Sequence, residues 1–166
     1  MRTRDRDAEF RDFYVTEAPR LRRLGIMLTG DVERGADLAQ DAMVKTYVAW
    51  HRIRNDDPAP YAKRTLVNLC RSSYRRRMLE IRKMPHPLRD VTDQGQRVDE
   101  ALRVATALSV LTPIRRAVVL LRFYEDMTEA EIARTLDRPL NTIKSDLRRA
   151  LERLRPMFDD NVRESR

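Results

Sequence analysis

Residues 128–154, TEAEIARTLDRPLNTIKSDLRRALERL, predict two short helices joined by a tight turn. Thr128 suits an N-cap, and Glu131 three residues later completes a capping box. Pro139 ends the first helix, because proline lacks an amide proton and disfavours helical backbone in the residue before it. Asn141 is the predicted N-cap of the second helix. The stretch therefore predicts a helix-turn-helix.

The second of these helices has one apolar and one polar face. Its apolar residues fall at helical spacing: Ile143, Leu147, Ala150, Leu151 and Leu154. Its other face carries Thr142, Lys144, Ser145, Arg148 and Arg149. Hydroxyl groups bind phosphates, and arginine can form two hydrogen bonds with a guanine edge. This pattern favours a helix that enters the major groove of DNA, and a solvated basic face on an ordinary helical hairpin is the alternative.

The composition favours a helical protein with a polyanionic partner. The 166 residues include 34 Lys and Arg against 26 Asp and Glu, which gives a net charge of +8. Only 4 residues are glycine and 6% are aromatic, which argues against a β-rich fold with many tight turns. An excess of positive charge suits nucleic acid.

Several function classes lack their sequence signals. No apolar run is long enough to cross a membrane, and the first residues do not resemble a signal peptide, so we expect a cytoplasmic protein without membrane insertion. Cys70, the single cysteine, lies in an apolar run and suits a core position. Neither a GxxxxGK[ST] motif nor a cluster of His, Cys and carboxylates is present, so we expect no catalytic site, metal, cofactor or small-molecule substrate.

A helix predicted from about Arg34 to Trp50 carries an acidic patch. Its expected core stripe is formed by Ala39, Met43, Tyr47 and Trp50. Asp37, Gln40 and Asp41 lie together on another surface. These acids can simply favour the helix dipole near the N-terminus, or they can form a docking patch for a basic partner.

The next predicted helix, from about Tyr61 to Leu79, carries a basic stripe. Arg64, Asn68, Arg71 and Arg75 recur at helical spacing on one face, with Lys63, Arg76 and Arg77 beside them. The charges suit phosphates and the amide suits a base edge. Tyr61 and Tyr74 offer aromatic surfaces for an unstacked base. The stripe favours a nucleic-acid strand, with a solvated basic face as the alternative.

These patterns predict an all-α chain of two small helical domains joined by a flexible linker. The first domain is predicted over residues 8–80, the linker over 81–99, and the domain that ends in the helix-turn-helix over 100–158, followed by a polar tail, 159–166. The linker assignment depends on Pro85, Pro87 and Gly95. Residues 51–60 are expected to form a loop. In the second domain, Thr112 and Pro113 should begin a helix that is apolar almost all round and therefore central to its bundle.

The chain resembles the extracytoplasmic-function (ECF) sigma factors, small promoter-specificity subunits of bacterial RNA polymerase. TGDVERGADLAQDAMVKTYVAWHRI resembles the polymerase-docking helix of this family, and YAKRTLVNLCRSSYRRR resembles its promoter-melting helix. LTPIRRAVVLLRFYEDMTEAEIARTL and NTIKSDLRRALERLR resemble its reader of the upstream promoter element. The order and spacing of these segments are more specific than any one of them.

The resemblance implies roles for the residues above. Asp37, Gln40 and Asp41 would meet the clamp helices of core RNA polymerase. The non-template strand of the minus-ten element would be held by Lys63, Arg64, Asn68, Arg71 and Arg75, with a flipped base at the loop around residues 51–57. The minus-thirty-five duplex would be read by Thr142, Lys144, Ser145, Arg148 and Arg149. The family pattern also implies control by an anti-sigma factor.

Three residues depart from the family pattern. Ala36 replaces a common glutamate, and Asp137 stands where the turn commonly has glycine, although aspartate tolerates left-handed backbone. Asp146 replaces a basic residue of the recognition helix, where a carboxylate would repel phosphate or accept a hydrogen bond from cytosine. Two other functions stay open from the residues alone: a free-standing helix-turn-helix repressor or activator, and an RNA-binding or anti-termination module.

Overall fold

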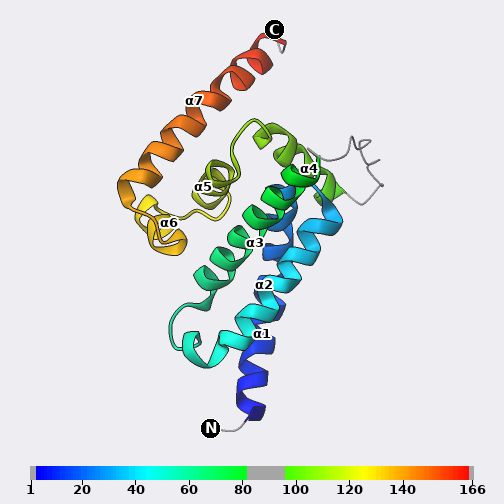
Figure 1. The fold of residues 1–166 in the computed structure, drawn as a ribbon, viewed down its shortest axis with the longest axis vertical. Coiled ribbons are helices and arrows are strands. Elements are labelled where there is room, and N and C mark those ends of the chain that lie inside the picture. Colours follow the sequence, from blue (N-terminus) through cyan, green and yellow to red (C-terminus); the bar gives the residue numbers. More distant parts are fainter. Residues whose placement is uncertain (1–2, 82–95, 165–166) are drawn as a thin grey trace.

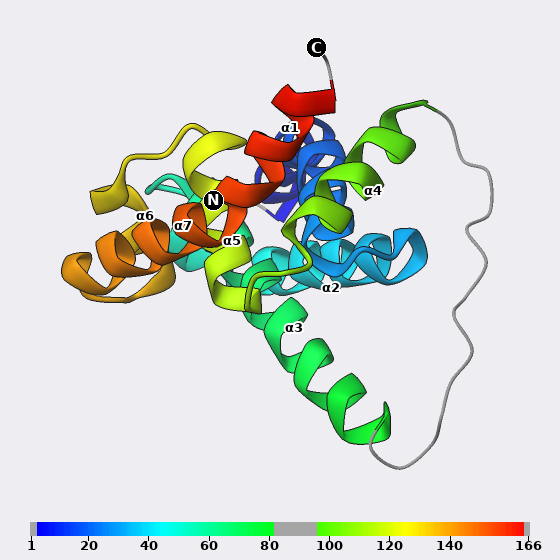
Figure 2. The same cartoon turned by 90° about the horizontal axis from the view of Figure 1, so that it is seen from above.

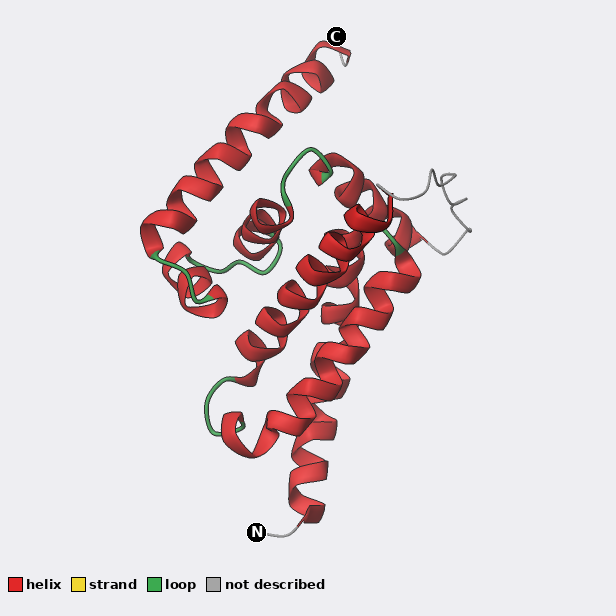
Figure 3. Cartoon of the chain, in the orientation of Figure 1, coloured by secondary structure: helices red, strands yellow, loops and turns green. Residues whose placement is uncertain are grey.

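The computed structural model describes residues 3–81 and 96–164, and this part of the chain is helical and contains no strand. Figure 3 shows the helices and the short loops that join them. The helices are α1 (Thr3–Thr29), α2 (Val32–Ile53), α3 (Pro58–Ile81), α4 (Gln96–Leu108), α5 (Pro113–Phe123), α6 (Glu129–Leu136) and α7 (Leu140–Glu164). The predicted all-α class is confirmed.

Helices α1, α2 and α3 form one bundle, in which they run side by side (Figure 1). The predicted core residues Ala39, Met43 and Trp50 of α2 are buried there, as are Leu66 and Cys70 of α3. At one end of the bundle an aromatic cluster joins α1 to α2, with the Phe10 ring 4.9 Å from Tyr47 and 5.1 Å from Trp50. Edge-to-face ring pairs of this kind add to the stabilisation from area burial alone.

Two glycines let α1 and α2 cross closely. A Cβ atom added at Gly25 would lie 2.5 Å from the carbonyl oxygen of Gly35, and one added at Gly35 would lie 2.5 Å from the backbone nitrogen of Ile26. Both contacts are with backbone, which cannot move aside as a flexible side chain can. This crossing fixes the part of α2 that carries the predicted docking residues.

The helix boundaries differ from the sequence prediction in several places. Pro19 lies inside α1 without interrupting it, because the carbonyl group that loses its helical partner belongs to exposed Val15, where water can bind it. The expected loop over 51–60 is confined to residues 54–57, because α2 continues to Ile53 and Pro58 begins α3. Residues 96–99, predicted as linker, start α4, and residues 159–164, predicted as tail, continue α7. The rest of the predicted linker, residues 82–95, lies outside the described residues.

Helix α5 is the centre of the C-terminal half, as its apolar sequence predicts. Its residues Ala117, Val118, Val119, Leu120 and Leu121 are all buried. Helices α6 and α7 pack around α5, while α4 packs mainly against α1 of the N-terminal bundle. Figure 2 shows α4 beside α1 and α2, with α5, α6 and α7 grouped on the other side. One continuous hydrophobic core therefore joins the two halves.

Candidate nucleic-acid interface

The helix-turn-helix is formed by α6 and α7. The Thr128 hydroxyl accepts from the Glu131 backbone N–H at 3.2 Å, and the Thr128 N–H donates to the Glu131 carboxylate at 2.7 Å. This is the predicted capping box. Hydrogen bonding of the Glu131 carboxylate to the backbone N–H and the side chain of Thr128 lowers the pKa of Glu131. Asp137 ends α6 in the left-handed backbone conformation, with φ 52° and ψ 54°. Glycine is the usual residue in this conformation at the end of a helix, and aspartate also tolerates it.

Helix α7 begins two residues earlier than predicted, at Leu140 and not at Thr142. Asn141 is not its N-cap, because the Pro139 carbonyl already accepts the N–H groups of Thr142 and Ile143. Ile143, Leu147, Ala150 and Leu154 are buried as expected. Leu151 was wrongly assigned to this apolar face, since it is 42% exposed.

The predicted duplex-reading residues lie on the outer side of α7. Lys144, Arg148 and Arg149 are exposed, and Thr142 and Ser145 are half-buried near the start of the helix. Asp146 points elsewhere: its carboxylate lies 3.4 Å from Arg115 of α5 and 3.8 Å from Arg138 of the turn, and its side chain is 13% exposed. Asp146 is therefore an ion-pair partner of residues within its own domain.

The predicted strand-binding residues share one helix, α3, but differ in exposure. Arg64, Asn68 and Arg75 are exposed, whereas Lys63 and Arg71 are half-buried. Burial and the nearby charges of Arg138 and Arg75 lower the pKa of Arg71. The gathered positive charges on this side of the chain suit an anion.

Two of these cations already have acidic partners from the C-terminal half. The Lys63 ammonium lies 2.6 Å from the Glu125 carboxylate, and Arg64 lies 3.4 Å from Asp137. Sequence reasoning missed Glu125, because nothing in its local pattern distinguishes it from a solvated acid.

The predicted docking residues are all exposed on α2. Asp37 and Asp41 lie one turn apart, and Gln40 accepts a 3.1 Å hydrogen bond from the Tyr14 hydroxyl of α1. Beside them is an apolar groove between α1 and α2, lined by Val15, Pro19 and Met43 among others. The predicted docking surface therefore combines the exposed carboxylates of Asp37 and Asp41 with the neighbouring apolar groove.

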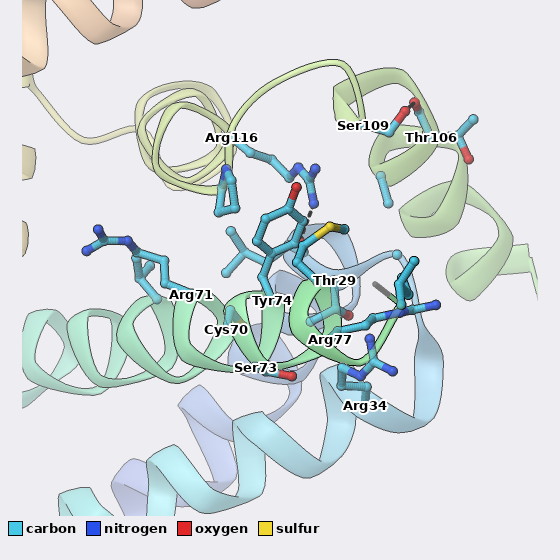
Figure 4. Close-up of a pocket in the computed structure, with 17 residues that line it drawn as sticks. Thr29, Arg34, Cys70, Arg71, Ser73, Tyr74, Arg77, Thr106, Ser109 and Arg116 are labelled. Atoms are coloured by element: carbon cyan, nitrogen blue, oxygen red, sulfur yellow. Dashed lines mark hydrogen bonds between the residues drawn. The ribbon is translucent and has the colours of Figure 1, made fainter. Parts of the chain in front are cut away.

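A cavity lies between the C-terminal half of α3 and helices α4 and α5 (Figure 4). Tyr74 of α3 and Arg116 of α5 point toward each other across it. Arg116 is 8% exposed and donates to the carbonyl groups of Leu28, Leu108 and Leu111. Burial lowers the pKa of Arg116. Sequence reasoning missed this residue, because the local pattern does not separate it from Arg115 and Arg122 on the same helix.

Metal and membrane chemistry find no support in the described part of the chain. Among residues 3–81 and 96–164, no group of three His, Cys, Asp or Glu side chains could hold a metal ion. None of the helices in these ranges is long and apolar enough to cross a membrane. Cys70 is buried, which raises the pKa of its thiol to about 12 and makes it a poor nucleophile.

Comparison with known proteins places both halves in one family. Residues 13–79 match sigma-70 region 2, and residues 101–154 match sigma-70 region 4. The RNA polymerase sigma-E factor of Streptomyces coelicolor is 36% identical over 152 residues, which cover 89% of this chain and 84% of that protein. The ECF RNA polymerase sigma factor RpoE of Cereibacter sphaeroides is 28% identical over 159 residues, covering 90% of this chain and 86% of that protein.

A solved structure shares the fold. The sigma factor RpoE in the co-crystal structure with the anti-sigma factor NepR from Bartonella quintana superposes with a TM-score of 0.71 and 21% identity, covering 90% of this chain and 96% of that one. The two region matches and the identity to the Streptomyces protein agree with the helix-turn-helix and basic helix described above. The chain therefore belongs to the ECF family of RNA polymerase sigma factors, which direct promoter-specific initiation of transcription.

Proposed function

We propose that the two halves of this sigma factor divide promoter recognition between α7 and α3. The single observation that carries the proposal is the pair of one-sided basic helices, one in each half, on a chain whose halves match sigma-70 regions 4 and 2. Helix α7 reads the minus-thirty-five element as duplex, and α3 holds the melted minus-ten element.

The upstream contact uses the outer side of α7. Thr142 and Ser145, near the helix N-terminus, contact phosphates, and Lys144, Arg148 and Arg149 reach base edges in the major groove. The buried residues Ile143 and Leu147 support this side, since they anchor α7 on the rest of the domain.

The minus-ten contact uses the basic stripe of α3. Lys63, Arg64, Arg71 and Arg75 neutralise phosphates of the non-template strand, and Asn68 bonds to a base edge. Extruding a base costs a few kcal/mol, and stacking returns about 1–3 kcal/mol per base. Binding energy can thus drive melting without nucleotide hydrolysis, so the chain acts as a binding subunit and not as an enzyme.

Docking to core polymerase uses the exposed acidic surface of α2. Asp37 and Asp41 supply charge for a basic partner helix, and the bond from Tyr14 fixes the side chain of Gln40. We place this activity in the cytoplasm, where the polymerase works. By analogy with the RpoE protein bound to NepR, an anti-sigma factor that covers these surfaces is the expected regulator.

In vitro transcription with purified core polymerase tests the proposal. A pool of upstream DNA fragments should give discrete transcripts only when this protein is added. Absence of transcripts, together with tight duplex binding by the protein alone, would instead favour a repressor, and preference for RNA would favour an RNA-binding module.

Two substitutions separate promoter reading from docking. Arg149→Ala should weaken transcription from the selected promoters roughly 5- to 150-fold, the equivalent of about 1–3 kcal/mol, while core binding survives. Asp37→Arg should abolish core binding and leave duplex binding intact. Exposed Arg103 and Asp12 provide matched controls, Arg103→Ala and Asp12→Arg, that should change neither property. Equal loss of both properties in either test variant would contradict the assigned roles.

A further inference from the structure

The cavity shown in Figure 4 has a strongly basic lining. Its volume is about 450 Å³, which lies within the range of sites that hold small organic molecules. No aspartate or glutamate is among the described residues that line it. Four arginines from three helices line it instead: Arg34 of α2, Arg71 and Arg77 of α3, and Arg116 of α5.

Much of this positive charge is not compensated by acids. Within residues 3–81 and 96–164, no ion pair joins Arg71 or Arg77 to a carboxylate. Arg116 donates three hydrogen bonds to backbone carbonyl groups, which do not neutralise its charge. Arginine has five N–H donors, so these bonds leave two of them for another acceptor. An anion in the cavity would supply both the missing charge and the missing acceptors.

An aromatic ring and apolar groups line the same cavity. Tyr74 of α3 faces Arg116 across it, and its side chain stays 39% exposed (Figure 4). Val67, Met78 and Pro113 add apolar surface. A flat ring can stack on tyrosine and on the plane of a guanidinium group, and arginine binds phosphate through charge-assisted hydrogen bonds. The lining therefore suits a molecule that has both a flat ring and a phosphate.

We propose that this cavity binds a small organic phosphate that carries an aromatic ring, the chemical class of the mononucleotides. The ring lies at Tyr74 and Arg116. The phosphate lies at Arg77, on the side of the cavity where Figure 4 also shows Arg34. This ligand is additional to polymerase and promoter DNA, and its binding does not depend on the roles proposed for α3 and α7.

Isothermal titration calorimetry on the full chain tests the proposal with three probes. Adenosine monophosphate has the ring and the anion, adenosine has only the ring, and inorganic phosphate has only the anion. Adenosine monophosphate should bind about tenfold or more tightly than either of the others, because each of them lacks one set of contacts. Equal affinity for adenosine monophosphate and inorganic phosphate would overturn the proposed ring site, and no binding of adenosine monophosphate would overturn the whole proposal.

Nuclear magnetic resonance shows where the nucleotide binds. The basic surfaces proposed to bind DNA could also attract a phosphate, so the position must be measured. Adenosine monophosphate should shift the amide signals of Tyr74, Arg77 and Ser109, which line the cavity, and leave those of Lys144 and Arg148 on α7 unchanged. Shifts confined to α7 would place the nucleotide on the duplex-reading surface and overturn the proposal.

Two substitutions change the cavity in different ways. Arg77→Gln, at an exposed residue, should weaken binding of adenosine monophosphate about tenfold, because it removes a charged donor to the phosphate. Arg76→Gln is the matched control, since Arg76 is the neighbouring exposed arginine and is not among the lining residues. Thr106→Trp should fill the cavity from α4 and abolish binding without changing the net charge.

The filling variant should remain folded. Thr106 is exposed, and its hydroxyl bonds only to the Leu102 carbonyl of its own helix, so its melting curve by circular dichroism should stay close to that of the native chain. Native affinity for adenosine monophosphate in either Thr106→Trp or Arg77→Gln would overturn the proposal. None of these measurements uses polymerase or promoter DNA, so the transcription experiment judges the proposed function separately.

Discussion

Replacing Arg116 with methionine tests how much one buried guanidinium contributes to this fold. Arg116 donates at 2.7 Å to the Leu28 carbonyl at the C-terminal end of α1, at 3.2 Å to the Leu108 carbonyl at the end of α4, and at 3.3 Å to the Leu111 carbonyl. Carbonyl groups at helix ends lack helical partners and carry partial negative charge. One cation therefore satisfies the ends of two helices from different halves of the chain.

The expected loss can be worked out bond by bond. Methionine has similar length but no donor. Leu108 keeps the hydrogen bond from the Leu111 N–H at 3.0 Å, so two carbonyl groups, those of Leu28 and Leu111, lose the partner that Arg116 supplied. An unsatisfied buried acceptor costs about 1–3 kcal/mol. We expect a net destabilisation of about 3 kcal/mol, which lowers the melting temperature by roughly 6–12 °C for a chain of this size.

Urea unfolding followed by far-ultraviolet circular dichroism measures this loss. Arg116→Lys should retain the charge but not the planar set of donors, and should lose about half as much free energy. Arg103→Met, at an exposed residue of α4, should stay within about 0.5 kcal/mol of the native chain. A change below about 1 kcal/mol in Arg116→Met would refute the reasoning, because it would mean that the carbonyl groups find other donors.

Three further outcomes are expected. Gly35→Ala should lower the free energy of unfolding by about 1–3 kcal/mol or more, because the added Cβ would lie 2.5 Å from the Ile26 backbone nitrogen; native-like urea stability would contradict the close crossing of α1 and α2. Glu131→Gln should destabilise the protein at pH 7. The hydrogen bonds from Thr128 lower the pKa of Glu131 below its ordinary 4.5. The stabilisation by the charged Glu131 carboxylate is therefore fully present above pH 4.5 and is lost as the pH falls through the lowered pKa. If the melting temperatures of the native chain and of Glu131→Gln differ by the same amount from pH 7 to pH 3, the stabilisation does not come from the charged carboxylate. Cys70, with a pKa of about 12, should react with a maleimide only as fast as the protein unfolds, and rapid labelling of the native chain would show that the α3 core opens locally.

Local patterns were sufficient where the determining interactions lie within a few residues. The capping box of Thr128 and Glu131 and the left-handed turn at Asp137 were predicted correctly, because both involve backbone groups at most five positions away. The apolar faces of α5 and α7 followed from helical periodicity. Leu151 was misplaced, because periodicity gives a face of the helix but not the width of the surface that packs against it.

Boundaries and pairings were less predictable. The loop expected over residues 51–60 is shorter in the structure, because Pro58 and Pro60 lie in the first turn of α3, where no helical partner is needed for their missing N–H groups. Pro19 is tolerated inside α1, because water can reach the carbonyl group that it leaves without a helical partner. Asp146 was predicted to face DNA, and its position on α7 allowed that orientation. Arg115, 31 residues away, and Arg138 turn it inward instead.

The sequence by itself determined the helical class, the helix-turn-helix and the basic helices, because each depends on residue order within a short segment. The family followed from the order and spacing of these segments along the chain. Only the tertiary structure decided which charges meet. The pairing of Lys63 with Glu125 spans two domains, and Arg116 reaches Leu28 across 88 positions. An ion pair depends on distance and on exclusion of water, and both are set by how the helices pack. Neither property can be derived from the residues on one helix alone.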